Sequence, residues 1–239
     1  LYEKAIQVDE RYALAWAGLA ESLGFWGFQK KLNGEDAAAQ ADFQRCLEAA
    51  RKAVEIAPNL GEAYRALAEA YSHVGEPDET SDQRADRRKK AALRATELND
   101  RDAEAYYQLW SATGQGLEGE SYGYIQKALQ INPRLSGALV DLGARYKEAG
   151  RVDEAIRHYE TALEVNPRDA NAWNNIANAY LSKNRVDDAI TAYEKALAIE
   201  ANDAIVQNNY GNALKRKERL DDAVAAYQRA IKINPKYAA

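Results

Sequence analysis

Few residues of this sequence have side chains that could carry out chemistry. The chain of 239 residues holds two histidines, His73 and His158, and a single cysteine, Cys46. This set is too small for a zinc site or a Ser-His-Asp relay, and one cysteine excludes an internal disulfide framework. We expect Cys46 to pack between helices, His158 to lie on a solvated helix face, and His73 to lie near a helix end within reach of a ligand. The sequence therefore predicts no enzyme, no metal site and no cofactor.

One glycine-rich segment has the spacing of a phosphate-binding loop. Residues 114–119 read GQGLEG and match G-x-G-x-x-G letter for letter. A dinucleotide site of this kind requires a β-strand before the motif. The preceding segment, AEAYYQLWSAT, instead has the apolar period of a helix. We therefore predict a loop between two helices at this position.

The charge pattern excludes the partners that a strongly charged chain would bind. The chain has 32 lysines and arginines and 37 aspartates and glutamates, a net charge of −5. It has no apolar run of the roughly 18 residues that a spanning helix needs. The basic run from Arg84 to Arg94 lacks interleaved aromatic residues, and Asp86 is one turn from Lys90. We predict a solvated helix face there, with a docking patch for an acidic partner as the alternative. The pattern favours a cytoplasmic protein that binds neither nucleic acid nor a membrane.

The sequence repeats itself, and the repeat determines which elements position any binding residues. The spacing from Pro167 to Pro235 is twice the spacing from Pro133 to Pro167. Between the prolines, runs such as ALVDLGARY and DEAIRHYETAL place apolar residues three and four positions apart. That period predicts two amphipathic helices in each unit, packed antiparallel through small residues.

The repeated unit resembles the tetratricopeptide repeat family, whose 34-residue unit carries this pattern. Small residues such as Gly143 and Gly211 stand where the two helices of a unit would touch. The resemblance implies an all-α fold, a right-handed superhelical solenoid of antiparallel helix pairs. It also implies that the first helices of successive units line a concave groove. The signature positions in the best-matching unit are occupied by Trp173, Ile176, Ala177, Tyr180, Ala189, Tyr193 and Ala196.

The resemblance extends over essentially the whole chain, as half a unit followed by about six. Because the chain has no methionine and begins in the middle of a unit, we expect it to be part of a longer protein. The expected units are a half repeat at 1–12, long units at 13–60 and 61–102, a divergent unit at 103–135, regular units at 136–169 and 170–203, and a last unit without a capping helix at 204–239.

The N-terminal units depart from the regular pattern in three places. Residues 24–33 should continue the preceding helix, with Phe25, Trp26 and Phe28 forming an exposed aromatic knob. Asp78 is a plausible helix cap. Trp110 stands where later units have glycine or alanine, which predicts an irregular joint, with the ring splaying the helix pair or turned out. The alternative is that Trp110 fills the space left by a small serine.

Asparagines are concentrated on the first helices of the fifth and sixth units. Asparagine lowers helix propensity, so a compensating role is expected. An amide both donates and accepts hydrogen bonds and can bind a peptide backbone. In terms of the resemblance, Asn175 and Asn209 would form a ladder along an extended segment, the alternative being that asparagine is simply common at these positions. The predicted groove contacts are Asn171, Asn174, Asn175, Asn178, Asn208, Asn209, Asn212, Lys215, Arg216, Asp141, Tyr107 and Arg65, with Tyr64 and Tyr106 as further contacts.

The resemblance leaves three hypotheses for function. The first is a non-catalytic protein-interaction scaffold that binds an extended peptide or partner segment in the concave groove. The second is a regulatory module of a larger bacterial enzyme or transcription regulator, because the N-terminal units resemble repeat arrays of such proteins. The third is a homo-oligomer that associates through uncapped ends. A grip on a C-terminal carboxylate, known in some members, is disfavoured because only Arg65 is cationic among the positions that would supply the lysine.

Overall fold

The computed structural model describes residues 1–32, 34–75 and 79–235. In that part of the chain the regular elements are all α-helices, which confirms the predicted all-α solenoid of helix pairs. The helices are α1 (Tyr2–Val8), α2 (Ala13–Leu32), α3 (Asp36–Ile56), α4 (Gly61–His73), α5 (Ser81–Leu98), α6 (Ala103–Ala112), α7 (Gly119–Ile131), α8 (Ser136–Glu148), α9 (Val152–Val165), α10 (Ala170–Ser182), α11 (Val186–Ile199), α12 (Ala204–Arg216) and α13 (Leu220–Ile233).

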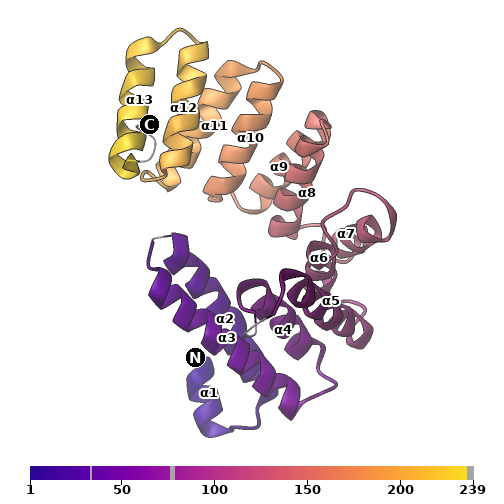
Figure 1. Cartoon of the computed structure of the whole chain (residues 1–239). Helices are drawn as coiled ribbons and strands as arrows, with labels where there is room; N and C mark the ends of the chain where they lie inside the picture. Colours follow the sequence, from indigo (N-terminus) through magenta and orange to yellow (C-terminus); the bar gives the residue numbers. More distant parts are fainter. Residues whose placement is uncertain (33, 76–78, 236–239) are drawn as a thin grey trace. The chain divides into compact units, whose positions relative to one another are not determined.

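The helices form two compact units, which we call the N-unit (Leu1–Pro133) and the C-unit (Arg134–Ala239). The N-unit contains the pairs α2/α3, α4/α5 and α6/α7, with α1 packed on α2. The C-unit contains α8/α9, α10/α11 and α12/α13 (Figure 1). The division follows Pro133, after α7, so the prediction of a joint near Trp110 is wrong. The individual repeat boundaries drawn from the sequence stay predictions.

Glycine and tyrosine bring the two helices of a C-unit pair together. A Cβ atom on Gly143 would lie 2.7 Å from the Tyr159 ring, and one on Gly211 would lie 2.6 Å from the Tyr227 ring. Both distances are shorter than a carbon–carbon contact allows, so the tyrosine ring occupies the space that the missing side chain leaves. The same pairing recurs two units further along because the repeat places the same residue types at the same contact.

Trp110 is accommodated inside the N-unit rather than turned out of it. Its side chain is fully buried, and its indole N–H donates to the carbonyl of Gly116 at 2.9 Å. The Ser121 hydroxyl lies 3.0 Å from the Thr113 hydroxyl and accepts from the Gly116 N–H at 3.2 Å. The segment after α6 is therefore a hydrogen-bonded loop between two helices. This confirms the predicted loop between two helices, except that Gly119 already belongs to α7, and excludes the dinucleotide interpretation.

The long N-terminal helices have the predicted extent but a different cap. Helix α2 continues to Leu32, and Phe25 and Trp26 are 56% and 58% exposed, which confirms the aromatic knob. Asp78 lies outside the described residues, and the cap of α5 belongs to Thr80. The Thr80 hydroxyl accepts from the Gln83 N–H, while the Gln83 side chain accepts from the Thr80 N–H. This reciprocal capping box satisfies two N–H groups at the start of α5.

Candidate functional site

The strongest candidate site is a cavity of about 470 Å³ in the C-unit, formed by α10, α11 and α12. We call it the amide pocket. Five of the residues predicted as groove contacts line it, and one helical face of α10 and one of α12 supply them. The lining residues are Asn178, Leu181, Tyr193, Asn209, Asn212, Lys215 and Arg216.

Two of the amides are held in place by tyrosines of the second helices. The Tyr193 hydroxyl donates to Oδ1 of Asn178 at 2.7 Å. The Tyr227 hydroxyl donates to Oδ1 of Asn212 at 2.9 Å. The second pair occupies the positions of the first pair in the next unit, so the bond belongs to the repeat. It fixes the amide oxygen and leaves the NH₂ group of each asparagine oriented by the fold.

A weaker network of amide hydrogen bonds, centred on Asn174, links α10 to α12. Oδ1 of Asn174 accepts from Nδ2 of Asn209 at 3.3 Å and from Nδ2 of Asn178 at 3.4 Å. Asn209 is therefore paired with Asn174, and the ladder of Asn175 and Asn209 along an extended segment stays a prediction. Both distances are long for an N–H···O bond, so a ligand can replace these bonds at small cost.

The amide pocket is cationic at one side. Lys215 and Arg216 lie in the last turn of α12, and both are exposed. The Arg216 guanidinium donates to the Leu181 carbonyl at 3.2 Å. None of the described residues that line this cavity is acidic. The pocket therefore offers amides for a backbone and two positive charges for an acidic group.

The other predicted contacts lie outside this cavity. Asn171 on α10 is exposed, while Asn175 and Asn208 are half-buried and do not line the pocket. Asp141 lies on α8, and Tyr107 lies in the N-unit, with its ring 6.3 Å from that of Trp110.

Sequence reasoning missed two lining residues, Leu181 and Tyr193. The repeat pattern places Tyr193 only among its signature positions. The available signal was the separation of Asn178 from Tyr193 along the chain, which is the same as that of Asn212 from Tyr227.

Arg65 is engaged in an ion cluster within the N-unit. Its guanidinium is 2.8 Å from a Glu21 carboxylate oxygen on α2 and 2.8 Å from the Asp102 carboxylate at the start of α6. Burial, together with the nearby negative charge of Glu21, raises the pKa of Glu69 to about 7. Arg65 thus joins three helices of the N-unit, and a contact between it and a partner stays a prediction.

The histidines and the cysteine are packed groups. The His73 ring stacks on Phe43 with centroids 4.4 Å apart, and burial lowers its pKa to about 4. The His158 ring stacks on Tyr146 at 5.2 Å and its pKa is lowered by burial, so the prediction of a solvated His158 is wrong. Cys46 is fully buried, as predicted, and burial raises its pKa to about 12. None of these three groups is poised for catalysis.

The basic helix α5 is less solvated than its sequence predicts. The Arg87 guanidinium lies 4.5 Å from the centroid of the Tyr71 ring, and Arg88 donates to the Ser111 hydroxyl at 2.9 Å. The prediction of a wholly solvated face is therefore wrong at these two arginines. The predicted ion pair between Asp86 and Lys90 is present at 2.7 Å.

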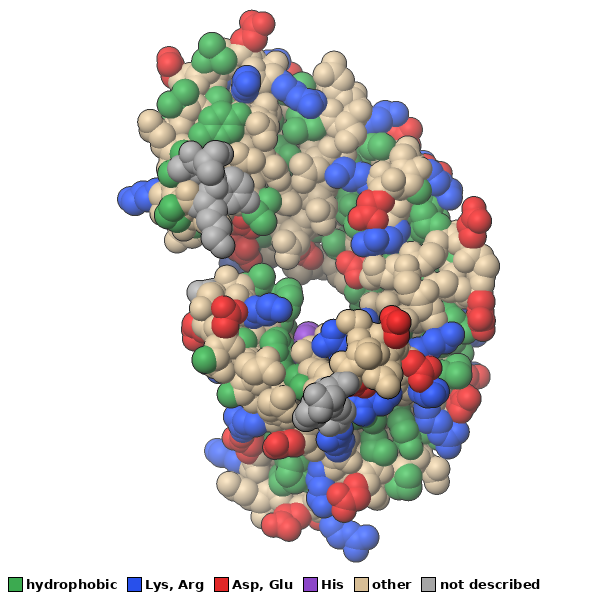
Figure 2. Space-filling view, in the orientation of Figure 1, with side chains coloured by type: hydrophobic (Ala, Val, Ile, Leu, Met, Phe, Trp, Pro, Cys, Tyr) green, Lys and Arg blue, Asp and Glu red, His purple; other side chains and the backbone are tan. Residues whose placement is uncertain are grey.

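On the face drawn in Figure 2, basic and acidic side chains are interspersed over both units. Over the described residues no helix combines the length and apolar character needed to cross a bilayer. The same residues contain no cluster of three or more histidine, cysteine or acidic side chains arranged to hold a metal ion.

Comparison with known proteins identifies the repeat. Two sequence models of the tetratricopeptide repeat match residues 140–204 and 204–237. A search of the curated proteins found no match.

Among solved structures, the Cut9–Hcn1 hetero-tetramer of the APC/C superposes with a TM-score of 0.74 at 18% identity, over 98% of this chain. This chain spans 42% of that chain's length. PilF of Pseudomonas aeruginosa gives 0.64 at 17% identity, covering 92% of this chain and 94% of its own. MamA of Desulfovibrio magneticus RS-1 gives 0.60 at 17% identity, covering 74% and 96%. At these identities the likeness establishes the fold.

Proposed function

We propose, from the premise that residues 140–237 of this chain belong to the tetratricopeptide repeat family, that the protein is a non-catalytic interaction scaffold. Its C-unit binds an extended segment of a partner protein in the amide pocket. The observation that carries this proposal is the convergence of three asparagine amides and two cations on one cavity of about 470 Å³. One structural neighbour is part of a hetero-tetramer, which supports a role in assembly.

The chemistry of the pocket suits a peptide backbone. An extended strand presents one N–H and one C=O per residue, and an amide side chain can satisfy either. Asn178 and Asn212 are held by tyrosine hydroxyls, so little side-chain entropy is lost when they bind. Each such hydrogen bond contributes about 1 kcal/mol. Recognition through the backbone makes the site tolerant of the partner's side chains.

The cations add one element of selectivity. Lys215 and Arg216 lie at the end of the amide pocket without an acidic neighbour among its described lining residues. An aspartate or glutamate in the bound segment would supply the missing charge. We therefore propose an extended segment with an acidic residue, whose affinity falls as salt is raised.

The test is a selection of peptides followed by a matched comparison. Random 12-residue peptides are selected on the intact chain, and the enriched peptides are titrated by fluorescence anisotropy. Asn209→Ala combined with Asn212→Ala should weaken binding by about 1–3 kcal/mol without unfolding the chain. Asn202→Ala, an exposed asparagine outside the pocket, is the control. Equal affinity in the double variant and the wild type would refute binding in the amide pocket.

Self-association is a second candidate function, supported by the surface of α13. Leu220 and Val224 lie one turn apart on this helix and are 61% and 53% exposed. A further helix packed on this face would bury both. Light scattering over a range of concentrations tests it, because Leu220→Glu with Val224→Glu should abolish any concentration-dependent rise in mass. The regulatory-module hypothesis stays a prediction that depends on sequence outside this chain.

A further inference from the structure

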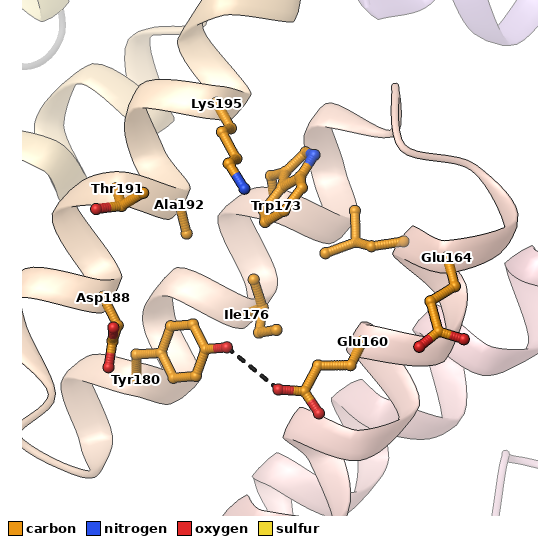
Figure 3. Close-up of a pocket in the computed structure, with 10 residues that line it drawn as sticks. Glu160, Glu164, Trp173, Ile176, Tyr180, Asp188, Thr191, Ala192 and Lys195 are labelled. Atoms are coloured by element: carbon orange, nitrogen blue, oxygen red, sulfur yellow. Dashed lines mark hydrogen bonds between the residues drawn. The ribbon is translucent and has the colours of Figure 1, made fainter.

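The C-unit has a second cavity on a different face of α10. It measures about 500 Å³ and lies between α9, α10 and α11 (Figure 3). Its α10 residues are Trp173, Ile176 and Tyr180, spaced by three and four, whereas the amide network uses Asn174 and Asn178. At 100° per residue the two sets lie on different sides of the helix. A ligand in this cavity, which we call the acid-aromatic pocket, therefore need not compete with one in the amide pocket.

The base of the acid-aromatic pocket is apolar and rigid. Ile176 and Leu163 are buried and give it an aliphatic surface. The indole N–H of Trp173 donates to the Pro167 carbonyl at 2.9 Å, which fixes the ring at the side of the cavity. The Lys195 ammonium lies 4.1 Å from the Trp173 ring centroid, and Figure 3 draws the two side chains next to each other. The aromatic face is thus already in contact with a cation.

The border of the acid-aromatic pocket carries three acidic side chains and one lysine, and Arg185 lies nearby over the Tyr180 ring. Glu160 and Glu164 stand one turn apart on α9, and among the described residues neither forms an ion pair. The Tyr180 hydroxyl donates to Glu160 at 3.3 Å, a long bond that leaves the carboxylate charge in place. Like charges at this spacing destabilise a helix. The third acid, Asp188, is neutralised by Arg185 at 2.7 Å.

We propose that the acid-aromatic pocket binds a basic segment of a partner protein that carries an arginine or lysine beside an apolar side chain. The aliphatic stem of the basic residue would lie on Ile176 and Leu163, and its charged group would reach Glu160 and Glu164. Charge complementarity favours this occupant over an acidic segment, because two carboxylates without ion pairs face one ammonium. Lys195 opposes the incoming charge. This site lies beyond the function proposed above and does not depend on it.

The experiment follows the ¹⁹F resonance of a labelled Trp173, which lines the pocket. The intact chain is labelled with 5-fluorotryptophan, and its four ¹⁹F resonances are assigned with single tryptophan-to-phenylalanine variants. The probe is a helical peptide of leucine and arginine, and the comparison probe has glutamate in place of arginine. We expect the basic peptide to shift the Trp173 resonance saturably and to leave the three N-unit tryptophans unchanged.

The variants carry predictions of opposite sign. Glu160→Gln with Glu164→Gln should raise the Kd of the basic peptide about fivefold, since each partly exposed ion pair contributes modestly. Lys195→Ala should lower the Kd, because it removes the repelling charge. Glu148→Gln with Glu200→Gln, which changes net charge equally at exposed acids outside the cavity, should leave it unchanged.

Four results would overturn the proposal. They are a Trp173 shift with the acidic peptide, a shift that follows chain concentration without peptide, an unchanged Kd in Glu160→Gln with Glu164→Gln, and no shift at all. The second would indicate another copy of the chain as the occupant. Because the readout is at Trp173, each result is independent of whether peptides bind the amide pocket.

Discussion

Two half-buried groups on α4 should make the N-unit respond to pH in opposite directions. Burial and the neighbouring charge of Glu21 raise the pKa of Glu69 to about 7. Burial against Phe43, with the positive charges of Arg88 and Lys31 nearby, lowers the pKa of His73 to about 4. The two residues are one turn apart. Replacing either one should reveal the effect of the other.

The sign of each pH dependence follows from whether the folded or the unfolded state binds protons more readily. Folded Glu69 binds a proton more readily than an unfolded glutamate with a pKa of 4.5. Its contribution to the free energy of unfolding is therefore full below pH 4.5 and is lost as the pH rises through about 7. Folded His73 binds a proton less readily than an unfolded histidine with a pKa of 6.5. Its contribution is full above pH 6.5 and is lost as pH falls through about 4. Between pH 4.5 and 6.5 the two contributions oppose each other.

The size of each effect follows from the same values. A pKa change from 4.5 to about 7 corresponds to about 3 kcal/mol at 1.36 kcal/mol per pH unit. Both side chains keep some contact with solvent, so about 2 kcal/mol is expected over the window. In Glu69→Gln the free energy of unfolding should therefore rise by about 2 kcal/mol from pH 4.5 to 6.5. In His73→Gln it should fall by about the same amount, and in the wild type it should change by less than either.

The assay must report on the N-unit alone. In a Trp173→Phe background every tryptophan lies in the N-unit, so fluorescence during urea unfolding follows that unit. Glu48→Gln, an exposed acid on α3, is the matched control and should reproduce the wild-type pH profile. Parallel profiles for Glu69→Gln, His73→Gln and the wild type would refute the reasoning, because they would show that neither group changes its proton affinity on folding.

Three further predictions test other contacts. Tyr193→Phe removes the hydroxyl that donates to Asn178 and should lower the free energy of unfolding of the C-unit by about 1 kcal/mol, as followed by the fluorescence of its one tryptophan during urea unfolding. Thr80→Ala removes half of the capping box with Gln83 and should cost about 1 kcal/mol, seen as faster hydrogen exchange in the first turn of α5. Cys46 is fully buried with a pKa of about 12, so it should resist a thiol reagent such as dithionitrobenzoate at pH 8 until urea unfolds the N-unit.

The fold could be predicted from sequence because the repeat samples the same contact several times. Gly143 and Gly211 identify the close approach of two helices, and the spacing of tyrosines identifies the partner side chains. The surroundings of the Trp110 ring could not be predicted in this way. The space for its ring and the hydrogen bond to the Gly116 carbonyl depend on the loop conformation, which occurs once in the chain. A feature without a second copy gives no internal comparison.

The residues of the amide pocket were predicted in part, and their pairing was not. Helical period placed Asn178, Asn209 and Asn212 on one surface, and the cavity brings them together. Period also placed Asn175 and Asn209 at equivalent positions of successive units, where the resemblance implied contacts with an extended segment. In the structure Asn209 reaches Asn174, which precedes its repeat equivalent Asn175 by one position. The offset arises from how α10 and α12 face each other, and one-dimensional spacing does not contain that rotation.

The repeat also distinguishes the two pockets by how often each can occur. The pair of Asn178 with Tyr193 recurs in the next unit as Asn212 with Tyr227, so the amide surface continues along the array and suits an extended ligand. The position of Trp173 is taken in the next unit by Gln207, which is buried. That unit therefore lacks the indole on which Lys195 rests, and its aromatic residue is instead Tyr210, at the position of Ile176, which donates to Glu194 at 3.0 Å. The acid-aromatic pocket is therefore suited to a single side chain of a partner, and the amide pocket to the partner's backbone.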